Sequence, residues 1–155
     1  MKTLDSAVVE APIFAGLEPA QAEPIAGCAQ NVRFRAGEFL FREGGAADSF
    51  YLLRHGRVSL ETFMPSRGSF SIETVDPGDV VGWSWLFPPY RWHFDARSLE
   101  DVAAVAFDGA CLRGKAATDN ELGYALLDRF ARVLVDRLDA TRLRLLDVYG
   151  AAAAR

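Results

Sequence analysis

Short hydrophobic stretches separated by glycine dominate the chain between Asn31 and Phe107. Val32, Arg33 and Phe34 alternate between apolar and polar positions, and Gly37 then breaks the pattern. The stretches that follow end in the same way, at glycine or at an Asp-Pro-Gly turn, and no helical pattern of ten residues lies between them. Because parallel strands need such helical crossovers, the spacing predicts an antiparallel β sandwich or small barrel over residues 31–107.

Helical patterns flank this β core on both sides. Residues 12–30 are rich in Ala, Glu and Gln, with Pro19 suited to the first turn of a short helix and Pro24 expected to kink or end it. After the core, Thr118 and Glu121 have the spacing of a capping box, in which the Thr118 side chain bonds the Glu121 amide. We therefore predict an N-terminal helix within residues 12–30 and a C-terminal helical segment over residues 118–148.

The C-terminal segment carries a narrow apolar seam with alternating steps of four and three residues, which is the a/d spacing of a coiled coil. A second apolar stripe beside it covers only the first half of the helix. A seam that continues beyond its second stripe predicts a parallel homodimer, and the alternative is a helix that packs on its own β core. The predicted interface residues are Leu127, Leu134, Leu138, Thr141, Leu145 and Val148.

Composition describes one ordinary globular domain, which we assign to residues 1–155. The net charge of −4 argues against a general binder of nucleic-acid backbones, which needs a basic face. No leader-like segment and no apolar run of the ~18 residues that span a membrane is present, so we expect a cytoplasmic protein without membrane contact. Cys28 and Cys111 are far apart and form no CxxC motif, which predicts two reduced thiols packed as small core residues.

Motifs of catalysis and metal binding are incomplete. The stretch from Gly109 to Lys115 has the GxxxxGK spacing of a phosphate-binding loop, but Ala116 stands where a Ser or Thr would hold Mg²⁺. We expect a loop or a helical turn there. His55 and His93 are the two histidines, and they belong to no metal-binding pattern. The sequence predicts neither an enzyme nor a metal site.

Seven short motifs follow one another in a specific order along the chain. They are Phe14-Ala15-Gly16-Leu17, Phe34-Arg35-Ala36-Gly37-Glu38, Phe41-Arg42-Glu43-Gly44, Asp48-Ser49-Phe50-Tyr51, Gly56-Arg57-Val58, Asp76-Pro77-Gly78-Asp79-Val80-Val81-Gly82 and Leu99-Glu100-Asp101. In this order they resemble the cyclic nucleotide-binding domain, in particular that of the Crp/Fnr superfamily of sensor regulators. The resemblance implies a mainly β fold with flanking helices: an eight-stranded jelly-roll barrel (a double-stranded β-helix), a ligand pocket inside it, and a long C-terminal helix that commonly dimerises.

The residues that should hold a cyclic nucleotide are replaced. In family members that bind one, the glycine equivalent to Gly82 precedes a glutamate for the ribose, and an arginine followed by Ser or Thr holds the phosphate. Here Trp83 occupies the glutamate position, and either Trp92 or His93 the arginine position, depending on the direction of counting. Losing two charge-assisted hydrogen bonds weakens binding by ~3–6 kcal/mol. Binding of cAMP or cGMP stays open, because the adjacent Arg91 is available for the phosphate.

Six aromatic residues are concentrated in this altered segment, between Trp83 and Phe94. Their alternation suits a hairpin, whereas the family resemblance implies a short helix over residues 82–87, which we favour. The rings fill the barrel, or line a remodelled pocket in which Arg91 or His93 would hold an anionic group, or form an aromatic surface on which a partner docks. The candidate ligand-binding residues are Gly82, Trp83, Ser84, Trp85, Arg91, Trp92 and His93.

Together these features predict a dimeric sensor module that binds a small ligand and regulates an unidentified effector protein. The alternative is a ligand-independent interaction module whose pocket is filled by aromatic rings. A third hypothesis, a transcription regulator of the Crp/Fnr type, is disfavoured, because the seven residues from Tyr149 onward cannot form a helix-turn-helix. We therefore expect no direct DNA binding and no resident cofactor, with cAMP or cGMP as the open alternative.

Overall fold

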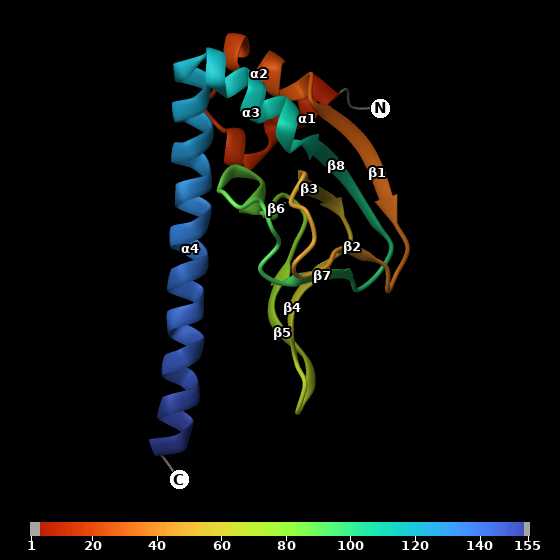
Figure 1. Ribbon diagram of the computed structural model, residues 1–155, viewed down its shortest axis with the longest axis vertical. Coiled ribbons are helices and arrows are strands. Elements are labelled where there is room, and N and C mark those ends of the chain that lie inside the picture. The colour runs from red at the N-terminus through yellow and green to blue at the C-terminus, as the bar shows by residue number, and fades with distance from the viewer. Residues whose placement is uncertain (1–3, 154–155) are drawn as a thin grey trace.

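Eight antiparallel strands form the centre of the computed structural model, which describes residues 4–153 (Figure 1). One four-stranded sheet has the order β1-β8-β3-β6, and the other has the order β2-β7-β4-β5. This arrangement confirms the predicted mainly β jelly-roll barrel. The strands are β1 (Ala29–Phe34), β2 (Phe39–Phe41), β3 (Ser49–His55), β4 (Val58–Met64), β5 (Gly68–Val75), β6 (Val80–Val81), β7 (Asp95–Ser98) and β8 (Val102–Asp108).

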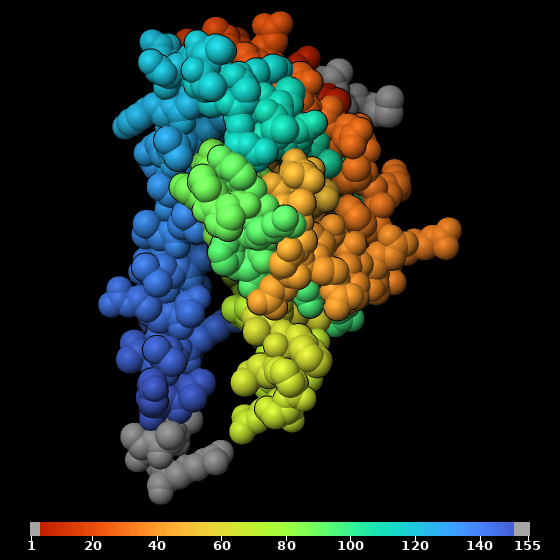
Figure 2. Space-filling view, viewed as in Figure 1, coloured from red at the N-terminus to blue at the C-terminus, as the bar shows by residue number. Residues whose placement is uncertain are grey.

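Helices gather at one end of the barrel and along one side of it (Figure 1). The region predicted as one helix over residues 12–30 is more divided: Pro19 begins α2, and β1 already starts at Ala29. The last helix, α4, passes along the barrel and continues beyond it in the same direction as the β4–β5 hairpin (Figures 1 and 2). The helices are α1 (Leu4–Glu10), η1 (Pro12–Phe14), α2 (Pro19–Ala26), η2 (Ser84–Leu86), α3 (Gly109–Thr118) and α4 (Asn120–Ala153).

Two hydrophobic clusters lie on the two faces of the β1-β8-β3-β6 sheet. Alternation along β8 sends Val102 and Ala104 into the barrel and sends Val105 and Phe107 outward, beneath the helices. In this outer layer the rings of Phe50 and Phe107 stack at 4.5 Å. The first half of α4 completes the layer with three fully buried side chains, so this half of the helix is fixed to the barrel. Those side chains are Leu122, Leu126 and Phe130.

The predicted capping box at Thr118 is wrong. α3 runs through Thr118, whose hydroxyl donates to the carbonyl of Lys115 at 3.2 Å, so Thr118 has no extended backbone with which to cap the next helix. Asp119 is extended instead, and its carboxylate accepts from the amide of Leu122 at 3.1 Å. The local sequence allowed the last helix to be capped by Thr118 or by Asp119. Because α3 extends through Thr118, the cap is Asp119.

The two cysteines are joined by a disulfide, so the prediction of two reduced thiols is wrong. Their Cα atoms lie 5.8 Å apart although 83 positions separate them in sequence. Sheet topology explains the pairing: Cys28 precedes β1, Cys111 follows β8, and Ala29 pairs with Phe107 where these neighbouring strands meet. The argument for a cytoplasmic location that rested on reduced thiols therefore no longer holds.

Residues 4–153 contain neither a membrane-spanning helix nor a metal-binding group of side chains. No helix in this range combines the length and the apolar character that a membrane crossing requires. No group of three or more His, Cys, Asp and Glu side chains in the same range is arranged to hold a metal ion.

Candidate functional site

The candidate site is the segment that connects β6 to β7, where the family resemblance places the nucleotide phosphate. The chain leaves β6 at Gly82, whose φ of +98° lies in the region that favours glycine, and then forms η2. This short helix agrees with the family resemblance and not with a hairpin over residues 82–87. Beyond it, Arg91 pairs with Ala46 in an isolated antiparallel bridge that brings the segment back onto the barrel.

The indole of Trp92 fills the barrel at this point. It is 5% exposed, and its ring stacks on Phe41 with 3.7 Å between centroids and 8° between planes. The edge of the ring meets Gly82, where an added Cβ would lie only 2.8 Å from the indole and 3.7 Å from the Phe41 ring. Glycine at position 82 is therefore required both by the backbone conformation and by the space that Trp92 occupies.

Arg91 and His93 lie on the opposite side of the chain from Trp92. Both residues are exposed, whereas Trp92 and Phe94 belong to the barrel interior. His93 uses Nδ1 for a 2.9 Å hydrogen bond with the hydroxyl of Ser84, which is the buried first residue of η2. Neither side chain faces the interior, so the structure gives no support to a rescue of phosphate binding by Arg91.

Trp85 belongs to a different part of the molecule from Trp92. It is fully buried in the helical layer, where its ring lies 5.0 Å from Phe50 and 5.2 Å from Phe130. Gly82 and Trp92, with the half-buried Trp83, adjoin the barrel interior, while Ser84 and Trp85 are the buried residues of η2 itself. The seven candidate ligand-binding residues are thus distributed over three environments and do not line one cavity.

Arg137 is a residue of this site that the sequence analysis missed. Its guanidinium lies 5.4 Å from the ring centroid of Trp83, donates to the carbonyl of Val80, and approaches Glu73 at 3.7 Å. The side chain is 12% exposed, and this burial lowers the pKa of the Arg137 guanidinium, while the negative charges of Glu73 and Asp79 act in the opposite direction. The missed signal was the second apolar stripe, which steps from Phe130 through Val133 to position 137.

The predicted dimer seam is exposed along the second half of α4. Leu138 is 58% exposed and Val148 is 66% exposed, and Leu145 and Thr141 are exposed as well. Leu134 is half-buried, and Leu127 is exposed at the start of the seam. The alternative in which the seam packs on the barrel of the same chain does not occur in this structure. Pairing of two copies stays a prediction.

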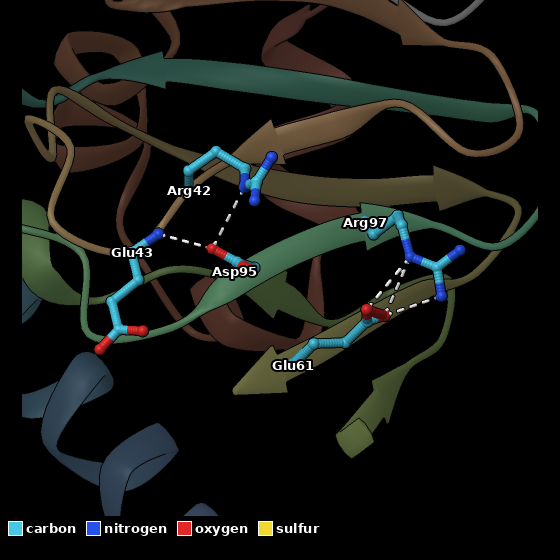
Figure 3. Close-up of polar contacts among 5 residues, drawn as sticks. All are labelled: Arg42, Glu43, Glu61, Asp95 and Arg97. Atoms are coloured by element: carbon cyan, nitrogen blue, oxygen red, sulfur yellow. Dashed lines mark hydrogen bonds and ion pairs between the residues drawn. The ribbon is translucent and has the colours of Figure 1, made fainter. Parts of the chain in front are cut away.

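A polar network on the second sheet holds the loop that supports Trp92 (Figure 3). The buried carboxylate of Asp95 accepts from the amide of Glu43 at 2.7 Å and faces Arg42 at 3.4 Å. Backbone bonds between this loop and Trp92 follow directly, since Gly44 donates to the Trp92 carbonyl at 2.9 Å and the Trp92 amide donates to Gly45 at 3.0 Å. The indole is therefore held through its backbone as well as through its ring.

A second ion pair stabilises the same sheet farther from the site (Figure 3). The carboxylate of Glu61 on β4 is almost fully buried and accepts from Arg97 Nε at 3.0 and 3.1 Å. Arg97 Nη2 lies 2.9 Å from the same carboxylate, so the pair is bidentate. This contact raises the pKa of Arg97 and fixes β4 beside β7.

A jelly-roll barrel with a helical end, a glycine-led segment after β6 and a long final helix defines a class of regulatory sensor domains. The model of the cyclic nucleotide-binding domain matches residues 31–119 of this chain. The chain belongs to the cyclic nucleotide-binding domain family.

Relatives of known sequence or structure agree with this assignment. A CRP-like cAMP-activated global transcriptional regulator of Mycobacterium tuberculosis is 30% identical over 145 residues, which cover 94% of this chain and 63% of the relative. A protein of known structure from Geobacter metallireducens, assigned provisionally as cyclic nucleotide-binding, is 31% identical and superposes with a TM-score of 0.78. The match covers 89% of this chain and 99% of the Geobacter metallireducens chain. The regulatory subunit of a cAMP-independent protein kinase A from Trypanosoma brucei has the same fold, with a TM-score of 0.74, 14% identity, and coverage of 92% and 50%.

Proposed function

We propose that this chain is a dimeric regulatory module in which aromatic side chains have taken the place of the cyclic nucleotide. The observation that carries the proposal is the packing of Trp92, which stacks on Phe41 and lies with its edge against Gly82, where the resemblance places the phosphate-binding residues. The module would act on an effector protein without needing cAMP or cGMP. It is the ligand-independent alternative among the hypotheses from the sequence, and the geometry favours it over the sensor of a small ligand.

The chemistry of the barrel interior supports this proposal. Among the described residues the buried charged side chains are carboxylates, those of Glu61 and Asp95, and no Lys or Arg is among them, so a phosphate in the barrel interior would lack a buried counter-charge. Trp83 stands at the position of the ribose-binding glutamate, and an indole donates a hydrogen bond but cannot accept one as a carboxylate does. Both recognition groups of a cyclic nucleotide would therefore remain unmatched.

The cost of opening the pocket also supports the proposal. A buried tryptophan removes roughly 150–250 Å² from water, which at ~25 cal/mol per Å² corresponds to about 4–6 kcal/mol. A ligand that displaced Trp92 would lose that amount from its binding free energy, equivalent to about three to four decades in affinity. Micromolar binding would then need compensating contacts that the interior does not offer.

The relatives do not decide between the two functions. The Mycobacterium tuberculosis relative is named as cAMP-activated, and it is longer than this chain. The Trypanosoma brucei protein is named as part of a cAMP-independent kinase and has the same fold. Dependence on a cyclic nucleotide is thus decided by the residues of the pocket and not by the fold.

Titration calorimetry with cAMP and with cGMP tests the proposal on the full chain. We expect no saturable heat up to about 1 mM ligand. A dissociation constant of about 1 mM corresponds to a binding free energy of only about −4.1 kcal/mol. A Trp92→Ala variant, in which a ligand no longer has to displace the indole, should still show no saturable heat in this range, because it gains space but no cation. Stoichiometric binding in the micromolar range by the unmodified protein would refute the proposal.

The remaining hypothesis, a sensor of another small ligand, has its own test. The half-buried ring of Trp83 beneath the Arg137 guanidinium is the contact that favours it. A metabolite panel would be screened by thermal shift, and hits would be repeated with Trp83→Ala. As a control, Phe87→Ala removes an exposed ring from the same segment. A hit that is lost in Trp83→Ala and kept in Phe87→Ala would establish the sensor instead.

The other parts of the proposal concern assembly and location. Homodimerisation would use the exposed seam of α4, and the effector would be a protein. We also propose that the module acts in the cytoplasm and has no enzymatic activity. Fractionation of cells that express the tagged chain tests its location.

A further inference from the structure

The Cys28–Cys111 disulfide ties α3 to the junction between α2 and β1. Cys111 lies in the first turn of α3, and Leu112 is the one large apolar side chain of this helix that is fully buried. The other connections near the disulfide are polar: Lys115 Nζ donates to the Pro24 carbonyl at 2.8 Å, and Asp108 donates its amide to Cys28 at 2.9 Å. Apart from Leu112, the connections of α3 to the α2–β1 junction are polar, so opening the disulfide should loosen this end of the helix.

The disulfide is accessible from the surface. A surface pocket of about 350 Å³ is lined by both cysteines together with residues from β1, β3 and β8. Cys28 is buried, whereas Cys111 is half-exposed, so Cys111 Sγ is the atom that an incoming thiolate meets first. Access and thiolate character govern thiol–disulfide exchange, and the pocket supplies the access.

α3 connects this disulfide to the altered segment and to α4. Two positions after Cys111, Arg113 donates to the carbonyl of Trp85 and lies 4.2 Å from the ring centroid of Tyr90. At its other end α3 is separated from α4 by Asp119 alone. A change in how firmly α3 is held therefore reaches both the segment that replaces the nucleotide site and the start of the predicted dimerisation helix.

We propose that Cys28–Cys111 is a thiol–disulfide exchange site, and that its partner is a dithiol reductant. One thiolate of the reductant attacks Cys111 Sγ, forming a mixed disulfide, and the Cys28 sulfur leaves as a thiolate that takes a proton from water. The second thiol of the reductant then displaces Cys111. The dithiol is oxidised to its disulfide, and the protein gains two thiols. The nucleotide pocket of this module is filled, so the redox state of the disulfide would supply a different regulatory input. This inference goes beyond the proposed function.

Hydrogen exchange on the full chain, oxidised and then treated with dithiothreitol, tests this site. Mass spectrometry after alkylation should show both cysteines blocked in the oxidised protein and both labelled after reduction. We expect amides of α3 to exchange about tenfold faster or more in the reduced protein, since local openings govern such exchange. Amides of Ser84–Leu86 should accelerate with them, while those of β4 should not change.

A double variant, Cys28→Ser with Cys111→Ser, is the matched control, and its exchange should be fast in α3 and insensitive to dithiothreitol. Equal exchange of α3 in oxidised and reduced wild-type protein would overturn the proposal. So would free thiols that persist after treatment with diamide. These outcomes are independent of the cyclic nucleotide titrations, so a failure here leaves the proposed function intact, and binding of cAMP would leave this site intact.

Discussion

Gly82→Ala is the substitution that most directly tests whether Trp92 fills the pocket. A new Cβ would meet the indole at 2.8 Å, which is closer than real contacts allow, and the φ of +98° is unfavourable for any residue with a side chain. The backbone conformation costs roughly 1–2 kcal/mol. Crowding in a packed interior adds about 1–3 kcal/mol. We expect the free energy of unfolding to fall by about 2–5 kcal/mol in total.

Gly37→Ala separates these two contributions. Gly37 has a similar φ of +88°, but no atom lies within 4 Å of an added Cβ. This variant should therefore lose only the roughly 1–2 kcal/mol that the backbone conformation costs. The difference between the two glycine variants measures the crowding against Trp92.

A double-mutant cycle then assigns the crowding to the indole. Trp92→Ala alone should destabilise by about 3–5 kcal/mol, as expected for a buried Trp. In that background Gly82→Ala should cost no more than Gly37→Ala, giving a coupling of about 1–3 kcal/mol. Unfolding in urea, followed by far-ultraviolet circular dichroism at one protein concentration, provides the values. If Gly82→Ala costs the same as Gly37→Ala in the unmodified protein, Trp92 does not lie against Gly82 and the filled pocket is refuted.

Three further predictions concern α4 and the disulfide. Arg137→Ala should lower the free energy of unfolding by about 1.5–3 kcal/mol, because it removes the hydrogen bond from a charged donor to the Val80 carbonyl. The control Arg132→Ala removes an exposed i,i+4 ion pair with Asp128 and should change the free energy of unfolding by less than about 0.5 kcal/mol. Sedimentation should give a dimer for the full chain and a monomer for a chain truncated after Arg137; a monomeric full chain at micromolar concentration contradicts the seam. Replacing Cys28 and Cys111 by serine should cost up to ~4.5 kcal/mol on the chain-entropy model for a separation of 83 positions, read from urea midpoints of the oxidised protein.

Much of the fold could be predicted from local patterns. Glycine-punctuated stretches and the four-and-three spacing indicated a β core and a long final helix, because hydrophobic periodicity follows directly from the geometry of strands and helices. The order of the motifs indicated the family. Helix boundaries were less predictable, and Thr118 shows why: its capping pattern was satisfied locally, but α3 continued through it.

The sequence was enough to locate the candidate site but not to determine which of its side chains point into the barrel. The aromatic residues near positions 83–94 marked where the pocket differs from the family pattern. Their alternation left open which side chains point inward. The bridge between Arg91 and Ala46 and the stacking on Phe41 placed Trp92 inside and Arg91 outside.

The sequence alone determined the class of fold, the place of the altered segment and the apolar seam of the final helix, because each depends on residues close together in the chain. Tertiary structure decided the rest through contacts between distant segments. It paired Cys28 with Cys111 because β1 and β8 are neighbours in a sheet. It buried Arg137 against Trp83 because α4 lies along the barrel. Such contacts depend on how strands are ordered in space, and no local pattern specifies that order.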